Sequence, residues 1–539
     1  MRINRRLKSI NIKNRGWRTI KSNSSFIIRS AAWMTALSLL NKTAGVFLRL
    51  YTSARIGSEG MGLYQLILSV YSMFSTFATA GFTVSVSRMV AEKGERSEGD
   101  ARLVMSNAFV ASALVSAAAT LLMLVFSNKI AEIFLGDIRA GAPLRILALS
   151  MPFMAAAACL KGWFIAKRKA VITSSASLFE QAVKFAVILL FLGIFFADVN
   201  DPRRLCTGIV IGVTVSEMSS CAFLFLFRFV GERRAKSVFL PTETRADNRR
   251  ELIKVTVPIS LSVYVTSIIH TVETMLVPFA FEKFSGDRSY ALSQFGVIRG
   301  MVIPVLFFPF AFLGSLVSVF TPEISRLNML EDKTLRNERI KKVMSFVSVF
   351  SIAAGGLFFA LPEQIGSAFY PGENTAGAIR LLAAVTPFMY IETVCDGILK
   401  AIGEQNKTLK YTVLNSALRV VLILTLVSSS GGEGYLRLLV ISNTFSYLLC
   451  RARLAKVTGA RPKLISGVFI PLLCAASGGF CAVKALEFFI PSGAPAAVAA
   501  AVGSGVYVAA FAAPLMVFSG KSIVGSLRRE SRTEESAAG

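Results

Sequence analysis

Long apolar runs recur along the whole chain, and they constrain its fold more than any other feature. Hydrophobic residues make up 54% of the 539 residues and charged residues only 17%, which is improbable for a soluble domain. About 20 apolar residues in a helix cross the ~30 Å hydrocarbon core of a bilayer. The sequence therefore predicts an all-α polytopic membrane protein.

The apolar runs predict fourteen transmembrane helices, six of them before a polar, arginine-rich stretch at 231–250 and eight after it. We expect a cytoplasmic basic tail (1–29), an N-lobe of spans 1–6 (30–230), a cytoplasmic linker (231–250), a C-lobe of spans 7–12 (251–452), spans 13–14 (463–518) and a cytoplasmic tail (519–539). The individual runs cover about 27–50, 62–91, 102–127, 143–166, 174–197, 205–229, 252–281, 290–320, 341–361, 376–402, 409–429, 435–450, 464–488 and 494–518.

The positive charge is placed to set orientation. With the N-terminus in the cytoplasm, the cytoplasmic segments hold 42 Lys and Arg residues and the opposite loops hold 11. Such a bias favours both termini in the cytoplasm and an even number of spans. The net charge of +27 then reflects the inner membrane face, where anionic lipids are the expected partners, and it indicates no nucleic-acid partner.

The basic tail leaves two interpretations open. Ile3, Leu7, Ile10 and Trp17 recur at near-helical spacing among its basic residues, which allows a surface helix on anionic lipid. The same segment could instead be an irregular tail that acts only as a topology signal. We favour the irregular tail.

An internal repeat relates the two halves. Residues 144–154 read LRILALSMPFM and residues 379–389 read IRLLAAVTPFM, an offset of 235. Without a gap, the same offset pairs Gly162 with Gly397 and Lys184 with Arg419. Because each unit holds six spans, an even number, the repeats are predicted to be parallel, related by an axis along the membrane normal. Spans 13 and 14 lie outside this repeat.

Basic residues inside the predicted spans are candidates for an anion-binding cavity, because a charge within the membrane is costly and usually functional. Lys42 and Arg49 lie seven residues apart on one face of span 1. Arg299 precedes Pro304, where span 8 should bend. Arg419 has no acid one turn away, unlike Lys184, which has Glu180. The alternatives are snorkelling of Lys42 or Arg49 to an interface and an ion pair of Arg299 with Glu273.

Acidic residues suggest an ion-coupling element. Glu392 and Asp396 share one face of span 10, and two close carboxylates in a low dielectric favour binding of a proton or cation. His270 and Glu273 lie one turn apart on span 7, close enough to pair. For each pair the alternative is a structural role, with Asp396 paired instead to Lys400. Glu217 on span 6 stays unassigned.

Several short motifs carry a family resemblance. They read ARIG at 54–57, GMGLYQ at 60–65, GFTVSVSR at 81–88, TPEIS at 321–325 and GEQNK at 403–407. The chain from about 30 to 515 resembles the multidrug/oligosaccharidyl-lipid/polysaccharide exporter superfamily. Within it, the resemblance is to the polysaccharide-flippase branch typified by stage V sporulation protein B, which is related to lipid II flippases.

The resemblance implies a monomeric flippase of the bacterial cytoplasmic membrane. It would move an undecaprenyl-diphosphate-linked saccharide outward by alternating access of two six-helix lobes, with a peptidoglycan precursor as the foremost cargo. Arg49 matches a cavity arginine of related lipid II flippases, and Lys42 matches a second basic position to within a residue. No cofactor is implied, although H⁺ or Na⁺ coupling would supply energy.

Two other functions compete with this one. A cation-coupled multidrug antiporter of the same superfamily would want acids and aromatics around a cationic drug, whereas Lys42 and Arg49 favour an anionic headgroup. A membrane glycosyl or acyl transferase would want a large outer loop, and the predicted outer loops are short. A single histidine and seven scattered cysteines favour no metal site. We therefore expect a transporter and no enzyme.

Overall fold

The structure is a computed structural model that describes residues 3–94, 97–199, 201–233, 244–459, 465–491 and 494–537. Within these ranges the chain forms helices and short connections and contains no strand. The prediction of an all-α chain is confirmed for this part of the protein.

The first half contains seven α-helices and three short π- or 3₁₀-helical turns. They are α1 (Ile3–Thr79), α2 (Phe82–Gly94), α3 (Glu98–Lys129), η1 (Ile130–Phe134), η2 (Ile138–Ala140), α4 (Gly141–Ala148), α5 (Met151–Ala166), α6 (Ala170–Leu190), η3 (Phe191–Phe195) and α7 (Pro202–Arg233). The basic segment 3–29 is part of α1, in one continuous helix with the first apolar run.

The second half begins with the long helix α8. Its elements are α8 (Arg245–Ser285), α9 (Arg288–Phe295), η4 (Gly296–Val302), α10 (Ile303–Leu306), α11 (Phe310–Met329), α12 (Lys333–Ala360), α13 (Pro362–Phe369), α14 (Ala376–Ala383), α15 (Thr386–Ala401), α16 (Gln405–Leu422), η5 (Ile423–Val427), α17 (Ser428–Thr458), η6 (Ile465–Phe469), α18 (Ile470–Phe489) and α19 (Ala496–Ala537).

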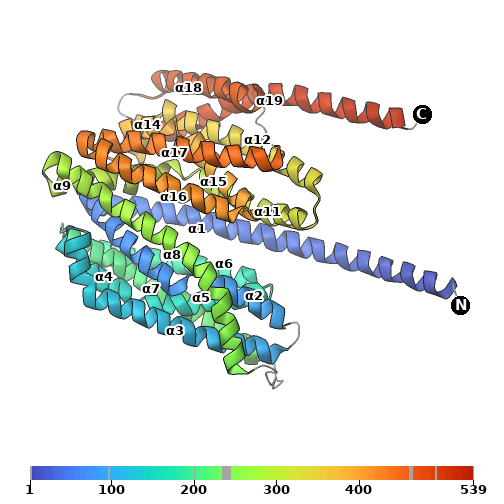
Figure 1. Cartoon of the computed structure of the whole chain (residues 1–539). Helices are drawn as coiled ribbons and strands as arrows, with labels where there is room; N and C mark the ends of the chain where they lie inside the picture. The colour runs from blue at the N-terminus through green and yellow to red at the C-terminus, as the bar shows by residue number, and fades with distance from the viewer. Residues whose placement is uncertain are drawn as a thin grey trace.

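The helices form two bundles with α1 and α8 between them (Figure 1). Helices α2–α7 make the first bundle and α11–α17 the second, while α18 and α19 pack on the outside of the second through α12 and α13. Each bundle has its own apolar core, around Met105 and Leu160 in the first and Tyr390 and Val394 in the second. Apolar side chains such as Leu121 on α3 are also exposed on the outer surface, as expected for contact with lipid.

Ten helices in the described ranges are long and apolar enough to cross a membrane, or twelve when the bent pairs α4–α5 and α14–α15 each count as one span. The protein is thus a multi-pass membrane protein. Two of the ten segments, Ala36–Gly94 and Gln405–Thr458, are 59 and 54 residues long. Each contains a glycine with non-helical backbone angles, Gly57 (φ 66°) and Gly431 (φ 57°). The positive φ at both sites favours glycine, which has no Cβ.

The bent pairs occur at matching places in the two halves. Helices α4 and α5 meet at 45°, and α14 and α15 meet at 56°. Every boundary of the second pair lies 235 residues after its counterpart in the first: 141 to 376, 148 to 383, 151 to 386 and 166 to 401. This is the offset of the sequence repeat. The two halves therefore share at least this local geometry.

The two halves meet tightly at one end of the molecule, where α1 passes α9 and η4. We call this the α1–α9 contact, made by Ser58, Glu59 and Gly62 with Ser289, Leu292, Ser293 and Gly296. A Cβ at Gly62 would lie 2.0 Å from the Leu292 carbonyl oxygen, and one at Gly296 would lie 1.9 Å from that of Ser58. Ser293 donates to Ser58 Oγ at 2.9 Å and Ser289 to Glu59 at 2.8 Å. The backbones touch because neither glycine has a side chain.

Candidate substrate cavity

A cavity of about 380 Å³ lies between α1 and α8, beyond the α1–α9 contact. It is an open space with mixed polar and apolar walls, of the size typical for binding small molecules or headgroups. Its lining residues are Gln65, Leu68, Ser69, Ser72 and Thr76 on α1, Val263, Thr266, Ser267, His270, Thr271 and Thr274 on α8, and Arg299 on η4.

Hydroxyl side chains dominate the cavity wall because both helices place them on one face. Positions 65, 69, 72 and 76 recur every three or four residues, which aligns them along α1. Many of these hydroxyls already donate to carbonyls of their own helix, as Ser69 does to Leu66 at 2.7 Å and Thr274 to His270 at 2.8 Å. Their oxygens therefore remain as acceptors for a sugar hydroxyl or water.

Arg299 is the permanent cation among the residues that line this cavity. It lies on η4, a π-helical stretch of the kind often found at functional sites. The helix is interrupted at 307–309, between α10 and α11, where Pro309 is the N-cap of α11. Arg299 Nη2 lies 3.3 Å from His270 Nε2. Because a guanidinium only donates, this contact requires a neutral imidazole with its proton on Nδ1.

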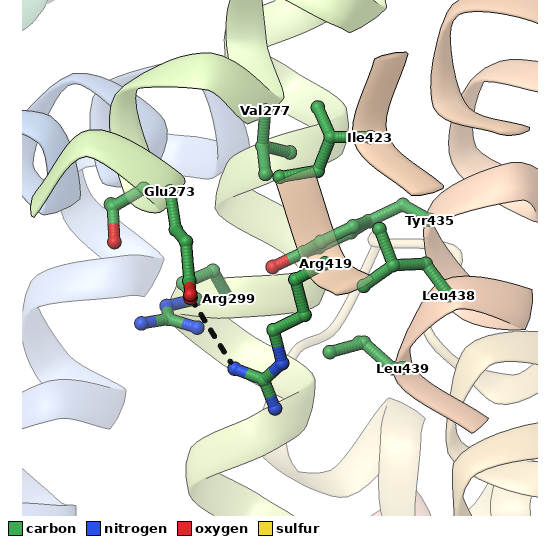
Figure 2. Close-up of a pocket in the computed structure, with 9 residues that line it drawn as sticks. Glu273, Val277, Arg299, Arg419, Ile423, Tyr435, Leu438 and Leu439 are labelled. Atoms are coloured by element: carbon green, nitrogen blue, oxygen red, sulfur yellow. Dashed lines mark ion pairs between the residues drawn. The ribbon is translucent and has the colours of Figure 1, made fainter. Parts of the chain in front are cut away.

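A second, small cavity of about 20 Å³ adjoins the first, since Thr274 and Arg299 line both. In it Glu273 Oε2 lies 3.6 Å from Arg419 Nη1 (Figure 2). Arg419 also donates to Ser442 Oγ at 3.2 Å and to Asn443 Oδ1 at 3.4 Å. Glu273 is therefore paired with Arg419, on α16, and not with Arg299.

Lys42 and Arg49 lie elsewhere on α1 and line neither of the two cavities. Lys42 is exposed, and its ammonium lies beside Gly314 of α11, where an added Cβ would come within 3.2 Å of it. Arg49 is half-buried, within electrostatic reach of Tyr64 and Tyr370. The structure thus gathers His270, Glu273, Arg299 and Arg419 and leaves the span-1 pair apart from them.

The two acids of α15 have different surroundings. Glu392 Oε1 accepts a hydrogen bond from Ser446 of α17 at 3.0 Å. Asp396 pairs with Lys400 at 2.6 Å and is 27% exposed, the arrangement given above as the structural alternative. In the first bundle, Lys184 lies 3.5 Å from Glu180. No group of three or more potential metal ligands occurs among the described residues.

The hydroxyl lining is the part of the site that the sequence analysis missed. Ser and Thr are common in helices of membrane proteins, so they stand out less in a sequence than charged residues do. A signal was available in the repeat of Gln65, Ser69, Ser72 and Thr76 along one face of the second apolar run. Gln65 Nε2 is buried and donates to no described residue.

Solved membrane transporters have the same fold. Solved structures that share the fold include "Lipid II flippase MurJ, inward closed conformation", with a TM-score of 0.69 and 15% identity over 91% of this chain and 99% of that one. A MOP-superfamily transporter from Pyrococcus furiosus has a TM-score of 0.57 and 14% identity over 79% and 96%. An inward-facing MATE family transporter has a TM-score of 0.56 and 15% identity over 80% and 100%.

Sequence comparison gives the family. The family described as "Polysaccharide biosynthesis protein" matches residues 27–328, more than half of the chain, and the protein belongs to it. Among relatives from Bacillus subtilis (strain 168), "Stage V sporulation protein B" is 22% identical over 433 residues, 79% of this chain and 82% of its own length. "Sporulation protein YkvU" is 21% identical over 61% of this chain and 72% of its own. The family resemblance noted in the sequence is confirmed.

Proposed function

We propose that the protein flips an undecaprenyl-diphosphate-linked saccharide from the cytoplasmic to the outer leaflet. The observation that carries this proposal is the cavity between α1 and α8, which combines hydroxyl-lined walls with the guanidinium of Arg299. Hydroxyl and amide groups suit a saccharide, and a guanidinium suits a phosphate. The similarity to a lipid II flippase supports the same cargo class, with a cell-wall precursor, used generally or in sporulation, as the foremost member.

We also propose that the protein has fourteen spans, arranged as two parallel repeats of six spans each, with α18 and α19 as the last two. Division of the two longest segments at Gly57 and Gly431 supports this count, together with the bent pairs taken as one span each. The shared 235-residue offset of the bent pairs supports the repeat. The excess of Lys and Arg in alternate loops supports cytoplasmic termini. In this orientation the α1–α9 contact lies on the outer side.

Alternating access then has a structural basis. With the α1–α9 contact closed, the headgroup enters the cavity from the cytoplasmic side, and separation of α1 from α9 and η4 would release it outward. We assign the first phosphate contact to Arg299 and the second phosphate contact to Arg419. Lys42 and Arg49 are assigned to an anion-attracting face of α1 outside the cavity.

Ion coupling is assigned to the second bundle. Glu392 is the better of the two α15 candidates, because Lys400 already neutralises Asp396. Binding of H⁺ or Na⁺ at Glu392 would favour one access state if the carboxylate is more enclosed in that state. His270 and Glu273 are assigned instead to control of the arginines at the headgroup site, since each contacts an arginine. We propose that the protein acts as a monomer among anionic lipids.

Translocation in proteoliposomes tests this function directly. The purified protein should move a fluorescent undecaprenyl-diphosphate saccharide to the opposite leaflet, and depletion in cells should leave the lipid-linked precursor on the cytoplasmic face. Transport of a lipophilic cation without transport of the diphosphate lipid would favour the drug antiporter instead. The cavity gives that antiporter little support, because Arg299 would repel a cation.

A further inference from the structure

The ion pair beside the cavity is loose and incompletely satisfied. Glu273 Oε2 and Arg419 Nη1 are 3.6 Å apart, whereas strong charged hydrogen bonds measure about 2.7–2.9 Å. The other carboxylate oxygen, Oε1, is buried and accepts no hydrogen bond from any described residue. The Glu273 side chain is only 9% exposed. A charge held this way is costly, so the pair is poised for exchange with a better partner.

The ion pair lies where a ligand that enters the large cavity can reach it. Figure 2 shows the Glu273 carboxylate paired with the Arg419 guanidinium, and Arg299 lines the same small cavity. Arg299 also faces the large cavity. An anion that enters next to Arg299 therefore approaches Arg419 with Glu273 as its competitor. Ser442 and Asn443 hold Arg419 through Nε and Nη2, which leaves Nη1 as the atom that can change partners.

We propose that Glu273 is an internal counter-anion that occupies Arg419 until a lipid diphosphate displaces it. This inference rests on the proposed flippase function. The first phosphate pairs with Arg299 in the large cavity, and the second takes Arg419 from Glu273. A monophosphate lipid reaches Arg299 only and leaves the ion pair intact. Glu273 is thus a specificity-determining residue that makes two phosphates necessary for full engagement.

The surroundings of Glu273 allow the displacement. His270 lies one turn before it on α8, and it loses its contact with Arg299 when that guanidinium turns to phosphate. The displaced carboxylate then has an imidazole as its alternative partner. When the headgroup leaves, Glu273 returns to Arg419 and shortens the lifetime of the bound state. The same residue therefore opposes binding and assists release.

Binding to the full-length protein in lipid nanodiscs tests the proposal. The probes are undecaprenyl diphosphate and undecaprenyl phosphate. Glu273→Gln should bind the diphosphate about tenfold more tightly, since Arg419 is freed for a charged contact worth about 1.4 kcal/mol. It should bind the monophosphate as the wild type does. Glu273→Asp, which keeps the charge, should restore wild-type affinity for the diphosphate.

A matched control removes an acid from another ion pair inside the membrane. Glu180→Gln breaks the Glu180–Lys184 pair, whose side chains are 15% and 19% exposed, and it should change neither affinity. Arg419→Gln should lower diphosphate affinity toward that for the monophosphate and should cancel the gain of Glu273→Gln in the double variant. Thermal unfolding of each variant verifies that it is folded, and Arg419→Gln tests the proposal even if Glu273→Gln does not fold.

The possible outcomes distinguish a failure of this inference from a failure of the proposed flippase function. If the wild type binds the diphosphate and Glu273→Gln binds it equally well, Glu273 is no competitor and the flippase proposal stands. Equal tightening for both lipids would overturn the discrimination by phosphate number. Failure of folded wild-type protein and folded Glu273→Gln to bind either lipid would overturn the proposed function and this inference together.

Discussion

Arg299 differs from Arg419 and Lys184 in the chemistry of its hydrogen-bond partner. Its hydrogen-bond partner is His270, a neutral group, so its charge is available to a ligand. Arg419 is paired with Glu273, and Lys184 with Glu180. Charge alone therefore does not identify a binding residue. What matters is whether an acid already neutralises the charge, because only an unneutralised cation in a cavity gains a strong contact from phosphate.

Arg299→Ala should reduce binding of a lipid diphosphate by about a hundredfold, because truncation removes a charge-assisted contact worth about 3 kcal/mol. Arg299→Lys should recover only part of this loss, since an ammonium cannot make a bidentate contact. Arg49→Ala is the matched comparison and should weaken binding less, because Arg49 lines neither cavity. Nanodisc binding measures all three, and equal loss in the two alanine variants would contradict the assignment of Arg299.

The acids of α15 give a prediction about energy coupling. Glu392→Gln should abolish the dependence of transport on the H⁺ or Na⁺ gradient, while Asp396→Asn should retain it, because Asp396 is already neutralised by Lys400. Transport in proteoliposomes with each gradient varied separately measures this. Unchanged gradient dependence in the Glu392→Gln, Asp396→Asn double variant would remove the pair from the coupling mechanism.

At the scale of helices, the α1–α9 contact controls which side the cavity faces. Glycine at 62 and 296 lets the two backbones meet, and the serine pair Ser58–Ser293 joins them at 2.9 Å. A helix contact made by small residues forms and separates without rearranging large side chains. The polar contacts of Ser289 with Glu59 and of Glu373 with the Ser58 backbone N–H add specificity at the same place.

Gly62→Val should prevent closure of this contact, because a Cβ there would lie 2.0 Å from the carbonyl oxygen of Leu292. We expect transport to fall at least about tenfold while the protein still inserts, since the clash acts on one access state only. Gly377→Ala, at a position with no neighbouring heavy atom within 4 Å of an added Cβ, should be neutral. Transport assays and membrane yield measure both, and normal transport by Gly62→Val would show that closure is dispensable.

A reversible lock gives a second test of the same helices. The double variant Ser58→Cys, Ser293→Cys, made in a background without the native cysteines, should form a disulfide when α1 and α9 are in contact. Oxidation should stop transport, and reduction should restore it. Continued transport by the fully oxidised protein would show that this contact need not open during the cycle.

The arrangement of helices in the whole molecule follows from the fact that lipid, and not water, is the solvent around them. Backbone polar groups must be satisfied within each segment in hydrocarbon, so apolar chains of this kind become helices. A polar cavity lies between α1 and α8, which join the two bundles, and there hydroxyls and Arg299 are kept from lipid. Helices α18 and α19 pack against α12 and α13 of the second bundle, and the residues that line the cavity come from other helices.

The proposed topology predicts the side of each loop. A reporter active only in the cytoplasm, inserted at Asp247 or fused after Leu330, should be active, whereas one at Gly286 should be inactive. The physical reason is the excess of Lys and Arg in the segments assigned to the cytoplasm. An extracellular signal from Asp247 would overturn both the orientation and the parallel repeat.

The sequence by itself determined the all-helical membrane fold and the family. These properties depend on local composition, because an apolar run of sufficient length makes a span wherever the chain goes. The repeat motif at 144–154 and 379–389 spans the bend of each bent pair, but the bends themselves came only from the structure. Each of these inferences needs only the order of residues along the chain and no contact between distant residues.

Only the tertiary structure decided which charges act together. Sequence spacing placed His270 beside Glu273. In the structure, however, His270 contacts Arg299 and Glu273 pairs with Arg419. These four side chains come from three separate elements, α8, η4 and α16. It also placed Arg49 outside the cavity and filled the wall with hydroxyls. Pairing of charges depends on distances between helices, and the packing of side chains far apart in the chain sets those distances.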